Sequence, residues 1–233
     1  MSQISENAEM TRRSSGKIPA LVIHAVLFYA FWAVWELLLK PAMISALGDG
    51  LTANVLDCCV KLVTWLIPAL LLIRRFSPEC AVGLKQMFTE KIPLKWVLLW
   101  VLVFFLLSSR TFFRGLFGGT LHVDPEFTVS GHLWLLIVGI TEEGVFRGWM
   151  LNATAKDEKD WKMLLLNAAM FVCIHIPIWI RKGMMTAAFA QFGFVSVLIV
   201  GLLTGYCFLK HKNLLLPVLA HTLYDFMLEF FKA

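Results

Sequence analysis

The chain has 233 residues, of which 59% are hydrophobic and only 16% carry a charged side chain, whereas soluble domains have about 25% charged residues. A soluble domain of this length could not bury so much apolar surface. The composition therefore excludes a disulfide-rich secreted scaffold, a disordered chain and a coiled coil, and it predicts a multi-pass membrane protein with one membrane domain.

Seven apolar segments have about the length that a membrane-crossing helix requires, roughly 20 residues. None shows the strict alternation of a barrel strand, so the expected fold is all-α, a polytopic bundle of about seven transmembrane helices. Residues 1–19 are polar and are expected to form a disordered cytosolic tail. Residues 20–233 would form a single transmembrane domain, with the functional motifs in 132–231. In chain order, the predicted segments are Ala20–Leu39, Leu51–Ile73, Ile92–Ser108, His132–Leu151, Met163–Ile180, Met184–Leu209 and Leu214–Phe231.

The positions of Lys and Arg predict the orientation, because cytosolic segments of membrane proteins carry an excess of them. If the N-terminus is cytosolic, 13 of the 21 Lys and Arg residues fall in cytosolic segments and 6 on the other side, while Lys61 and Arg147 lie within apolar helices. This rule accounts for the net charge of +5 without a nucleic-acid partner. We expect a cytosolic N-terminus in a bacterial plasma membrane, since the tail is short and carries no organelle signal.

Ionisable side chains inside the apolar segments are informative, because placing one at membrane depth costs at least about 2.5–3.5 kcal/mol. Asp57 and Lys61 are four residues apart on one predicted helix, and we interpret them as a self-neutralising pair. Glu36 lies near the outer end of its helix and is expected to reach the membrane interface. The remaining residues of this kind are Glu142, Glu143, Arg147, His175, His221 and Asp225.

The fourth segment carries three of these charges. Glu143 and Arg147 are four residues apart, so they share a helix face and can pair. Glu142 points about 100° away from Glu143 and has no partner on its own helix. An uncompensated carboxylate in an apolar setting is suited to act as a general base. The alternative is that Glu142 only bonds a polar group of a neighbouring helix.

His175 on the fifth segment and His221 with Asp225 on the seventh bring further polar groups to a similar depth. Counted from the cytosolic ends of the helices, the depths of Glu142, His175 and His221 are about 10–21 Å, which predicts one cavity in the cytosolic half. Such a set can cleave an amide without a covalent intermediate. Glu142 would take a proton from a water that His175 holds, and His221 would donate to the oxyanion.

These residues form three motifs that lie in order on three separate predicted helices. The motifs are Glu142-Glu143-x-x-x-Arg147, Phe171-x-x-x-His175 and His221-x-x-x-Asp225. The set resembles the signature of the CPBP family of intramembrane proteases. This family includes the type II CAAX prenyl proteases and bacterial membrane proteases linked to abortive infection and bacteriocin processing.

The resemblance implies a glutamate-dependent endopeptidase that cleaves a peptide or a membrane-tethered protein near the cytosolic face. Glu142 and His175 would activate water, and His221 with Asp225 would form the oxyanion site. Glu143, Arg147 and Phe171 would support these residues. The resemblance favours hydrolysis without a cofactor, although Glu142, His175 and His221 are also an acceptable set of zinc ligands.

Asp225 departs from the family pattern, because the last motif most often ends in Asn. An ionised Asp would repel an oxyanion, so we expect Asp225 to orient His221 by accepting a hydrogen bond from its other ring nitrogen.

Two other functions remain open at this point. Intramembrane Glu, His and Asp residues also serve proton-coupled transporters, although the sequence shows neither an internal repeat nor paired broken helices. A non-catalytic immunity or scaffold protein could keep the same fold. Expected partners are the substrate and membrane lipids, and the sequence does not predict an oligomeric state.

Overall fold

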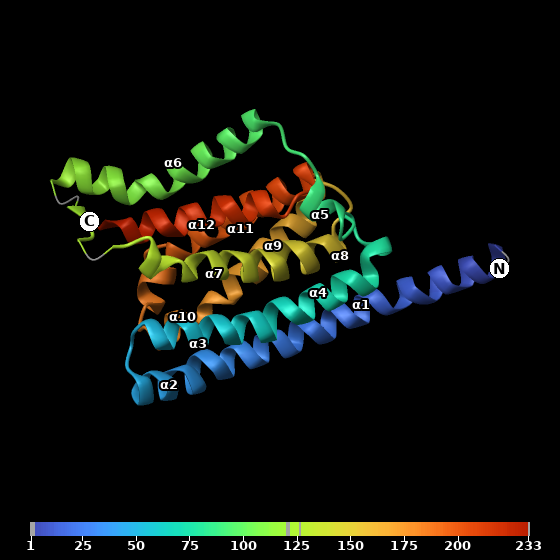
Figure 1. The fold of residues 1–233 in the computed structure, drawn as a ribbon, viewed down its shortest axis with the longest axis horizontal. Coiled ribbons are helices and arrows are strands. Elements are labelled where there is room, and N and C mark those ends of the chain that lie inside the picture. The colour runs from blue at the N-terminus through green and yellow to red at the C-terminus, as the bar shows by residue number, and fades with distance from the viewer. Residues whose placement is uncertain (1–2, 120–121, 126, 233) are drawn as a thin grey trace.

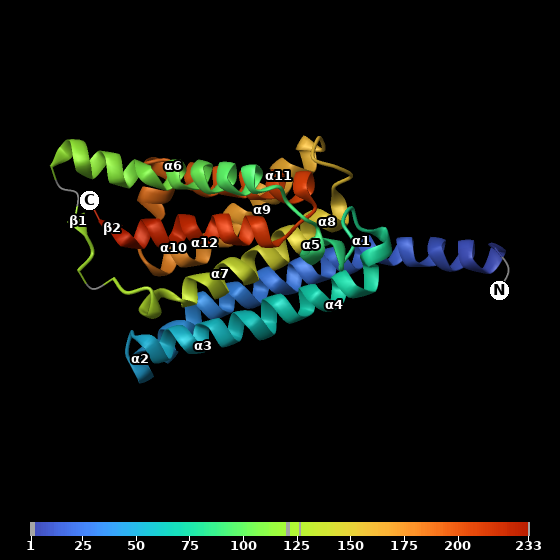
Figure 2. The same cartoon turned by 45° about the horizontal axis from the view of Figure 1, so that its top comes forward.

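The computed structural model of the chain describes residues 3–119, 122–125 and 127–232, and it shows an all-α bundle (Figures 1 and 2). The first half begins with a long helix that continues through a π-helical turn, and the other long helices run roughly along the same direction (Figure 1). Its elements are α1 (Gln3–Val34), η1 (Trp35–Leu39), α2 (Lys40–Leu47), α3 (Leu51–Lys61), η2 (Leu62–Leu66), α4 (Ile67–Phe76), η3 (Ser77–Glu79), α5 (Gln86–Thr89) and α6 (Leu94–Gly118).

The second half carries the three motifs. Two short strands, β1 (His122–Val123) and β2 (Phe231–Lys232), pair antiparallel and join the segment after α6 to the C-terminal end of the last helix. The helical elements are η4 (Ser130–His132), α7 (Trp134–Glu143), η5 (Gly144–Leu151), α8 (Asn152–Thr154), α9 (Trp161–Cys173), α10 (His175–Arg181), η6 (Thr186–Ala190), α11 (Gly193–His211) and α12 (Leu215–Phe230).

All seven predicted apolar segments are largely helical, which confirms the all-α prediction. Among the described residues, four helical spans are long and apolar enough to cross a membrane: Gly16–Leu47, Leu51–Glu79, Trp161–Arg181 and Gly193–His211. A shorter apolar helix covers Leu94–Ser109. The count of about seven transmembrane helices therefore stays a prediction. Helix α1 begins at Gln3 and so includes most of the segment expected to be a disordered tail.

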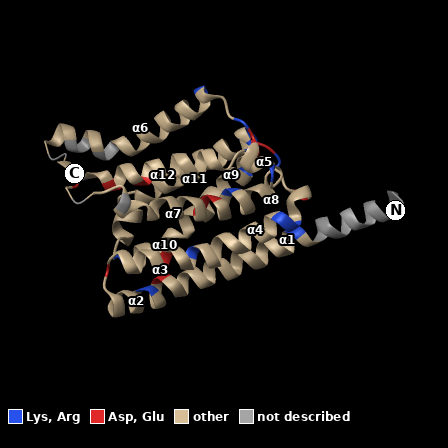
Figure 3. Cartoon of the chain, in the orientation of Figure 1, with Lys and Arg blue, Asp and Glu red and all other residues tan. Residues whose placement is uncertain are grey.

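The connections alternate between two ends of the bundle (Figure 1). One end, here called the N-terminal end, holds the start of α1, the α4–α6 connection, the α8–α9 loop and the α11–α12 turn. The other, called the distal end, holds the α2–α3 turn, the segment between α6 and α7, the end of α10 and the C-terminus. Figure 3 shows several Lys and Arg residues at the N-terminal end, around α5 and the start of α6.

An aromatic cluster fills the middle of the bundle. Trp32 and Trp65 pack edge to face at 4.5 Å between ring centroids, and Phe146 packs on Phe171 at 5.2 Å. The indole nitrogen of Trp32 donates to the carbonyl of Ile174 at 2.9 Å. Because a buried indole needs an acceptor, this bond ties α1 to the point where α9 ends and α10 begins, next to His175.

Close contact between α7 and α12 sets the spacing of two motifs. A Cβ atom added at Gly139 would lie 2.5 Å from the Thr222 hydroxyl oxygen, so a larger residue would require the Thr222 side chain to move. Glu142 lies one turn after Gly139, and His221 adjoins Thr222. The glycine therefore lets the helices that carry Glu142 and His221 approach each other closely.

Candidate active site

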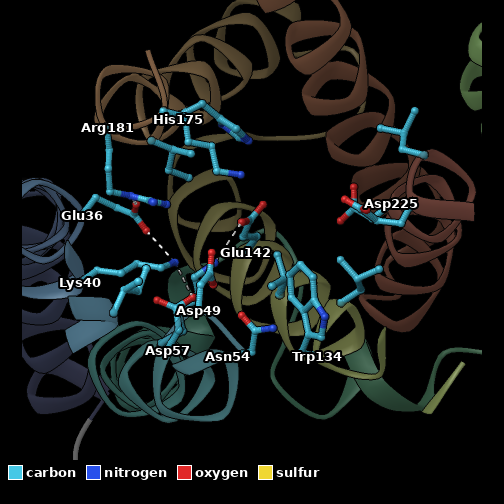
Figure 4. A pocket seen from close by; sticks show the side chains of 18 of the residues that line it. Glu36, Lys40, Asp49, Asn54, Asp57, Trp134, Glu142, His175, Arg181 and Asp225 are labelled. Atoms are coloured by element: carbon cyan, nitrogen blue, oxygen red, sulfur yellow. Dashed lines mark hydrogen bonds and ion pairs between the residues drawn. The ribbon is translucent and has the colours of Figure 1, made fainter. Parts of the chain in front are cut away.

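A cavity of about 390 Å³ lies between α3, α7, α10 and α12, and four predicted catalytic residues line it: Glu142, His175, His221 and Asp225. Figure 4 shows Glu142 near the centre of the view, with His175 and Asp225 on different sides of it. The structure thus brings together side chains that are up to 83 positions apart in the sequence. A polar cavity of this kind can admit water and a peptide segment.

The cavity opens at the distal end of the bundle, where the exposed residues Asp49 and Lys182 line it. With the predicted cytosolic N-terminus, the distal end would lie on the other side of the membrane, and the cavity would open away from the predicted cytosolic half. The physical reason is packing. On the N-terminal side of the site, Phe76 stacks on the fully buried Trp149 at 5.8 Å between ring centroids.

Glu143 and Arg147 form the predicted ion pair, with 3.2 Å between Arg147 Nε and Glu143 Oε2, and both side chains are fully buried. Arg147 Nη2 also donates to the Gly201 carbonyl at 3.1 Å, and its guanidinium lies 4.4 Å from the centroid of the Phe171 ring. The pair therefore links the motif helix to α9 and α11. The π-helical turn η5 begins directly after Glu143, and such turns occur frequently at functional sites.

His221 is oriented by Glu143. Its Nδ1 lies 2.8 Å from Glu143 Oε1, whereas its Nε2 lies 3.6 Å from Asp225 Oδ2. A carboxylate accepts, so Nδ1 carries a hydrogen and donates it to Glu143. The orienting role predicted for Asp225 is therefore filled by Glu143, and Asp225 instead flanks the nitrogen that faces the cavity. Spacing within α12 shows that His221 and Asp225 share a face, but it cannot reveal an acceptor on α7.

Glu142 has partners on two other helices. Its Oε1 lies 3.8 Å from Lys61 Nζ, and its Oε2 lies 3.9 Å from His221 Nε2. The expected pair of Asp57 with Lys61 interacts only at longer range, because Asp57 accepts from Trp35 Nε1 at 2.7 Å and makes its direct ion pair with a different lysine. Lys61 is thus the cavity residue that sequence reasoning missed, and its position inside an apolar helix was the signal.

Glu36 also departs from its prediction. Its side chain is fully buried and does not extend to the interface. It accepts from Arg181 Nε at 2.7 Å and pairs with Lys40 Nζ at 3.1 Å, and Lys40 lies 3.1 Å from Asp57 Oδ2. These four residues form one charge-alternating network on the cavity wall (Figure 4). The network ties α10, which begins with His175, to η1, α2 and α3.

His175 is fixed by the helix that precedes it. Its Nδ1 lies 2.9 Å from the Phe171 carbonyl oxygen, which can only accept, so Nδ1 carries the hydrogen and Nε2 is the acceptor of the neutral ring. The ring packs between Phe171, at 5.1 Å, and Trp179, at 5.7 Å between centroids. Phe171 therefore supports the site through both its carbonyl and its ring.

Glu142, His175 and His221, the alternative zinc set, all line the cavity. Across residues 3–119, 122–125 and 127–232, no three His, Cys, Asp or Glu side chains are arranged to hold a metal ion. We therefore derive no step through a metal.

A comparison with known protein families gives a match in the second half of the chain. A family model described as Type II CAAX prenyl endopeptidase Rce1-like matches residues 124–227, which include all three motifs. No curated protein and no solved structure matches the chain. The apolar helices and the family together indicate an integral membrane protein. The match confirms that residues 124–227 resemble this family of proteases, as the three motifs predict.

Proposed function

We propose that this chain is a glutamate-dependent intramembrane endopeptidase that hydrolyses its substrate without a metal or other cofactor. The observation that carries the proposal is the convergence of Glu142, His175 and His221 on one cavity. Glu142 Oε2 and His221 Nε2 are 3.9 Å apart, so a single oxygen atom can contact both. This spacing suits a base and an oxyanion donor acting on the same peptide bond.

In this mechanism, Glu142 Oε2 takes a proton from a water while Nε2 of His175 accepts a hydrogen bond from it. The water oxygen attacks the carbonyl carbon of the substrate, and the electron pair of the C=O bond moves to the carbonyl oxygen. The doubly protonated form of His221 donates from Nε2 to this oxyanion. When the C–N bond breaks, the electron pair returns to re-form the carbonyl, and the leaving amine takes the proton that Glu142 holds.

The substrate would be a peptide or a membrane-tethered protein that reaches the site from the distal end. The excess of Lys and Arg in the segments at the N-terminal end supports a cytosolic N-terminus, in a bacterial plasma membrane. The cavity would then face away from the cytosol, so we replace the expected cleavage near the cytosolic face with cleavage on the opposite side. Exported peptides and exported segments of membrane-bound proteins become the favoured substrates.

Cysteine labelling tests this orientation. Asp49→Cys at the distal end should react in intact cells with a membrane-impermeant maleimide, whereas Lys159→Cys in the α8–α9 loop should react only after lysis. Burial raises the pKa of the native Cys80 thiol to about 11, so Cys80 reacts slowly at neutral pH, and the unsubstituted protein measures the background. The reverse labelling pattern would place the cavity on the cytosolic side.

A cleavage assay separates the proposed protease from the two other functions. Purified protein in proteoliposomes should cleave members of a peptide library, and a chelator should not reduce the rate. Uptake that depends on a proton gradient, without cleavage, would favour the transporter. Neither activity would favour the immunity or scaffold protein. Loss of cleavage on chelation that added zinc restores would contradict the metal-free mechanism.

Asp225 gives a graded prediction. We expect Asp225→Ala to lower kcat/KM by about tenfold, the equivalent of one hydrogen bond, and Asp225→Asn to recover most of this loss. An amide keeps the shape of the side chain and can donate a hydrogen bond to an oxyanion. The carboxylate lies 3.6 Å from His221 Nε2, and when it is ionised it can only accept a hydrogen bond. Equal loss in both variants would show that the charge of Asp225 is required.

A further inference from the structure

Lys61 is a buried cation beside the proposed base. Its residue is 5% exposed, and it lies at the C-terminal end of α3, on a helix outside the three motifs. Its ammonium lies 5.1 Å from the ring centroid of Trp32 and 5.2 Å from that of Trp65. Both distances are within the range of a cation–π interaction, so two indole rings hold the ammonium in place.

The contacts of Lys61 differ from those of Lys40, a half-buried lysine on the same cavity wall. Lys40 lies 3.1 Å from both Glu36 and Asp57, which belong to the charge-alternating network. Lys61 lies 3.8 Å from Glu142 Oε1, and Asp57 is bound to Trp35 and Lys40 instead. A buried ammonium without a carboxylate nearby would be costly; the direct carboxylate contact of Lys61 is with Glu142, and Asp57 adds a longer-range attraction.

The two oxygens of Glu142 therefore have different surroundings. Oε1 faces Lys61 from α3, and Oε2 faces His221 from α12 at 3.9 Å. A carboxylate free to rotate could present either oxygen, or neither, to the water. We propose that Lys61 is a positioning residue that holds Oε1 of Glu142, so that Oε2 is the oxygen that takes the proton from the attacking water.

This inference rests on the proposed function, because it assigns Lys61 to the base of that mechanism. It also predicts that kcat and KM respond differently to the loss of Lys61. Lys61 would act on the proton-transfer step and not on the affinity for substrate, so its loss should lower kcat and leave KM nearly unchanged. Partners that orient an active group typically contribute about 10–100-fold.

The test compares three purified variants with wild-type protein in proteoliposomes, on one peptide substrate. Lys61→Met keeps the length of the side chain and removes the charge, and we expect kcat to fall about 10–100-fold with KM within about threefold of wild type. Lys61→Arg keeps a cation that can contact Oε1 and should recover at least half of the loss on a logarithmic scale. Lys210→Met is the matched control, because it removes an ammonium that also lies over an indole ring, 4.8 Å from the Trp96 centroid, but outside the cavity, and its kcat should stay within about twofold of wild type.

Three results would overturn the inference. Wild-type kcat in Lys61→Met, an equal loss of kcat in Lys61→Met and Lys61→Arg, or a loss confined to KM would each contradict it. Where Lys61→Met does not fold by thermal melting, Lys61→Gln takes its place in the same comparison. Glu142→Gln, assayed in parallel, distinguishes failure of the proposed function from failure of the role of Lys61. An active Glu142→Gln overturns the proposed function. An inactive Glu142→Gln beside a fully active Lys61→Met overturns only the role of Lys61.

Discussion

Replacing Glu142 by Gln is expected to lower kcat/KM by about 10²–10⁴-fold, the usual contribution of a general base. The amide keeps the size of the side chain and can still contact Lys61 and His221, but it cannot accept the proton of the attacking water. The effect should fall on kcat, because the substrate contacts of the cavity wall remain. Initial rates of peptide cleavage in proteoliposomes measure it.

Two controls support this experiment. Glu158→Gln makes the same chemical change in the α8–α9 loop at the N-terminal end of the bundle, away from the cavity, and should leave kcat/KM within about twofold. Thermal melting should show that Glu142→Gln is folded. Cleavage by Glu142→Gln at the wild-type rate would remove Glu142 from the mechanism, and the transporter and the non-catalytic protein would then regain support.

Much of the fold and of the cavity lining could be predicted from the sequence, because both depend on local patterns. Apolar runs of about 20 residues predict helices in a membrane protein, and the structure places helices in each of them. The spacing of Glu143 and Arg147 predicts their ion pair, which the structure contains. The rarity of charge at membrane depth then identifies residues that line the cavity, including Glu142 and His221.

Partners on different helices could not be predicted in this way. Spacing along one helix shows which residues share its face, but not how that helix is rotated or which neighbour it meets. Spacing alone therefore pairs Lys61 with Asp57 and His221 with Asp225, whereas the direct contacts in the structure are with Glu142 and Glu143. In both cases, the sequence offered a partner four residues away, and the folded chain supplied one from α7.

The end of the bundle at which the cavity opens is determined by side-chain packing and not by a pattern along one helix. The depth of a residue along a helix does not show from which membrane face a cavity around it is open. That depends on which end of the bundle is closed by packed side chains. Phe76 and Trp149 pack at the N-terminal end, while a turn that contains Asp49 borders the cavity at the distal end. An apolar helix face gives the same signal whether it meets lipid or an aromatic neighbour, so this asymmetry is visible only in three dimensions.

Replacing Arg147 by Met is expected to destabilise the protein strongly. Glu143 and Arg147 are both fully buried, and removal of one partner of a buried pair leaves an uncompensated charge, at a cost of about 3–5 kcal/mol. For a chain of this size, this corresponds to a fall in Tm of roughly 6–20 °C. Arg74→Met, which removes an exposed arginine, should change the free energy of unfolding by less than about 0.5 kcal/mol.

The double variant Glu143→Gln/Arg147→Met separates the stability of the pair from its role in the site. It removes both charges, so it should unfold at a higher temperature than Arg147→Met alone. Its cleavage rate should nevertheless stay low, because the Glu143 carboxylate that accepts from His221 Nδ1 has become an amide. A double variant that regained both stability and wild-type activity would show that Glu143 only neutralises Arg147, and that His221 needs no carboxylate to be positioned for the oxyanion.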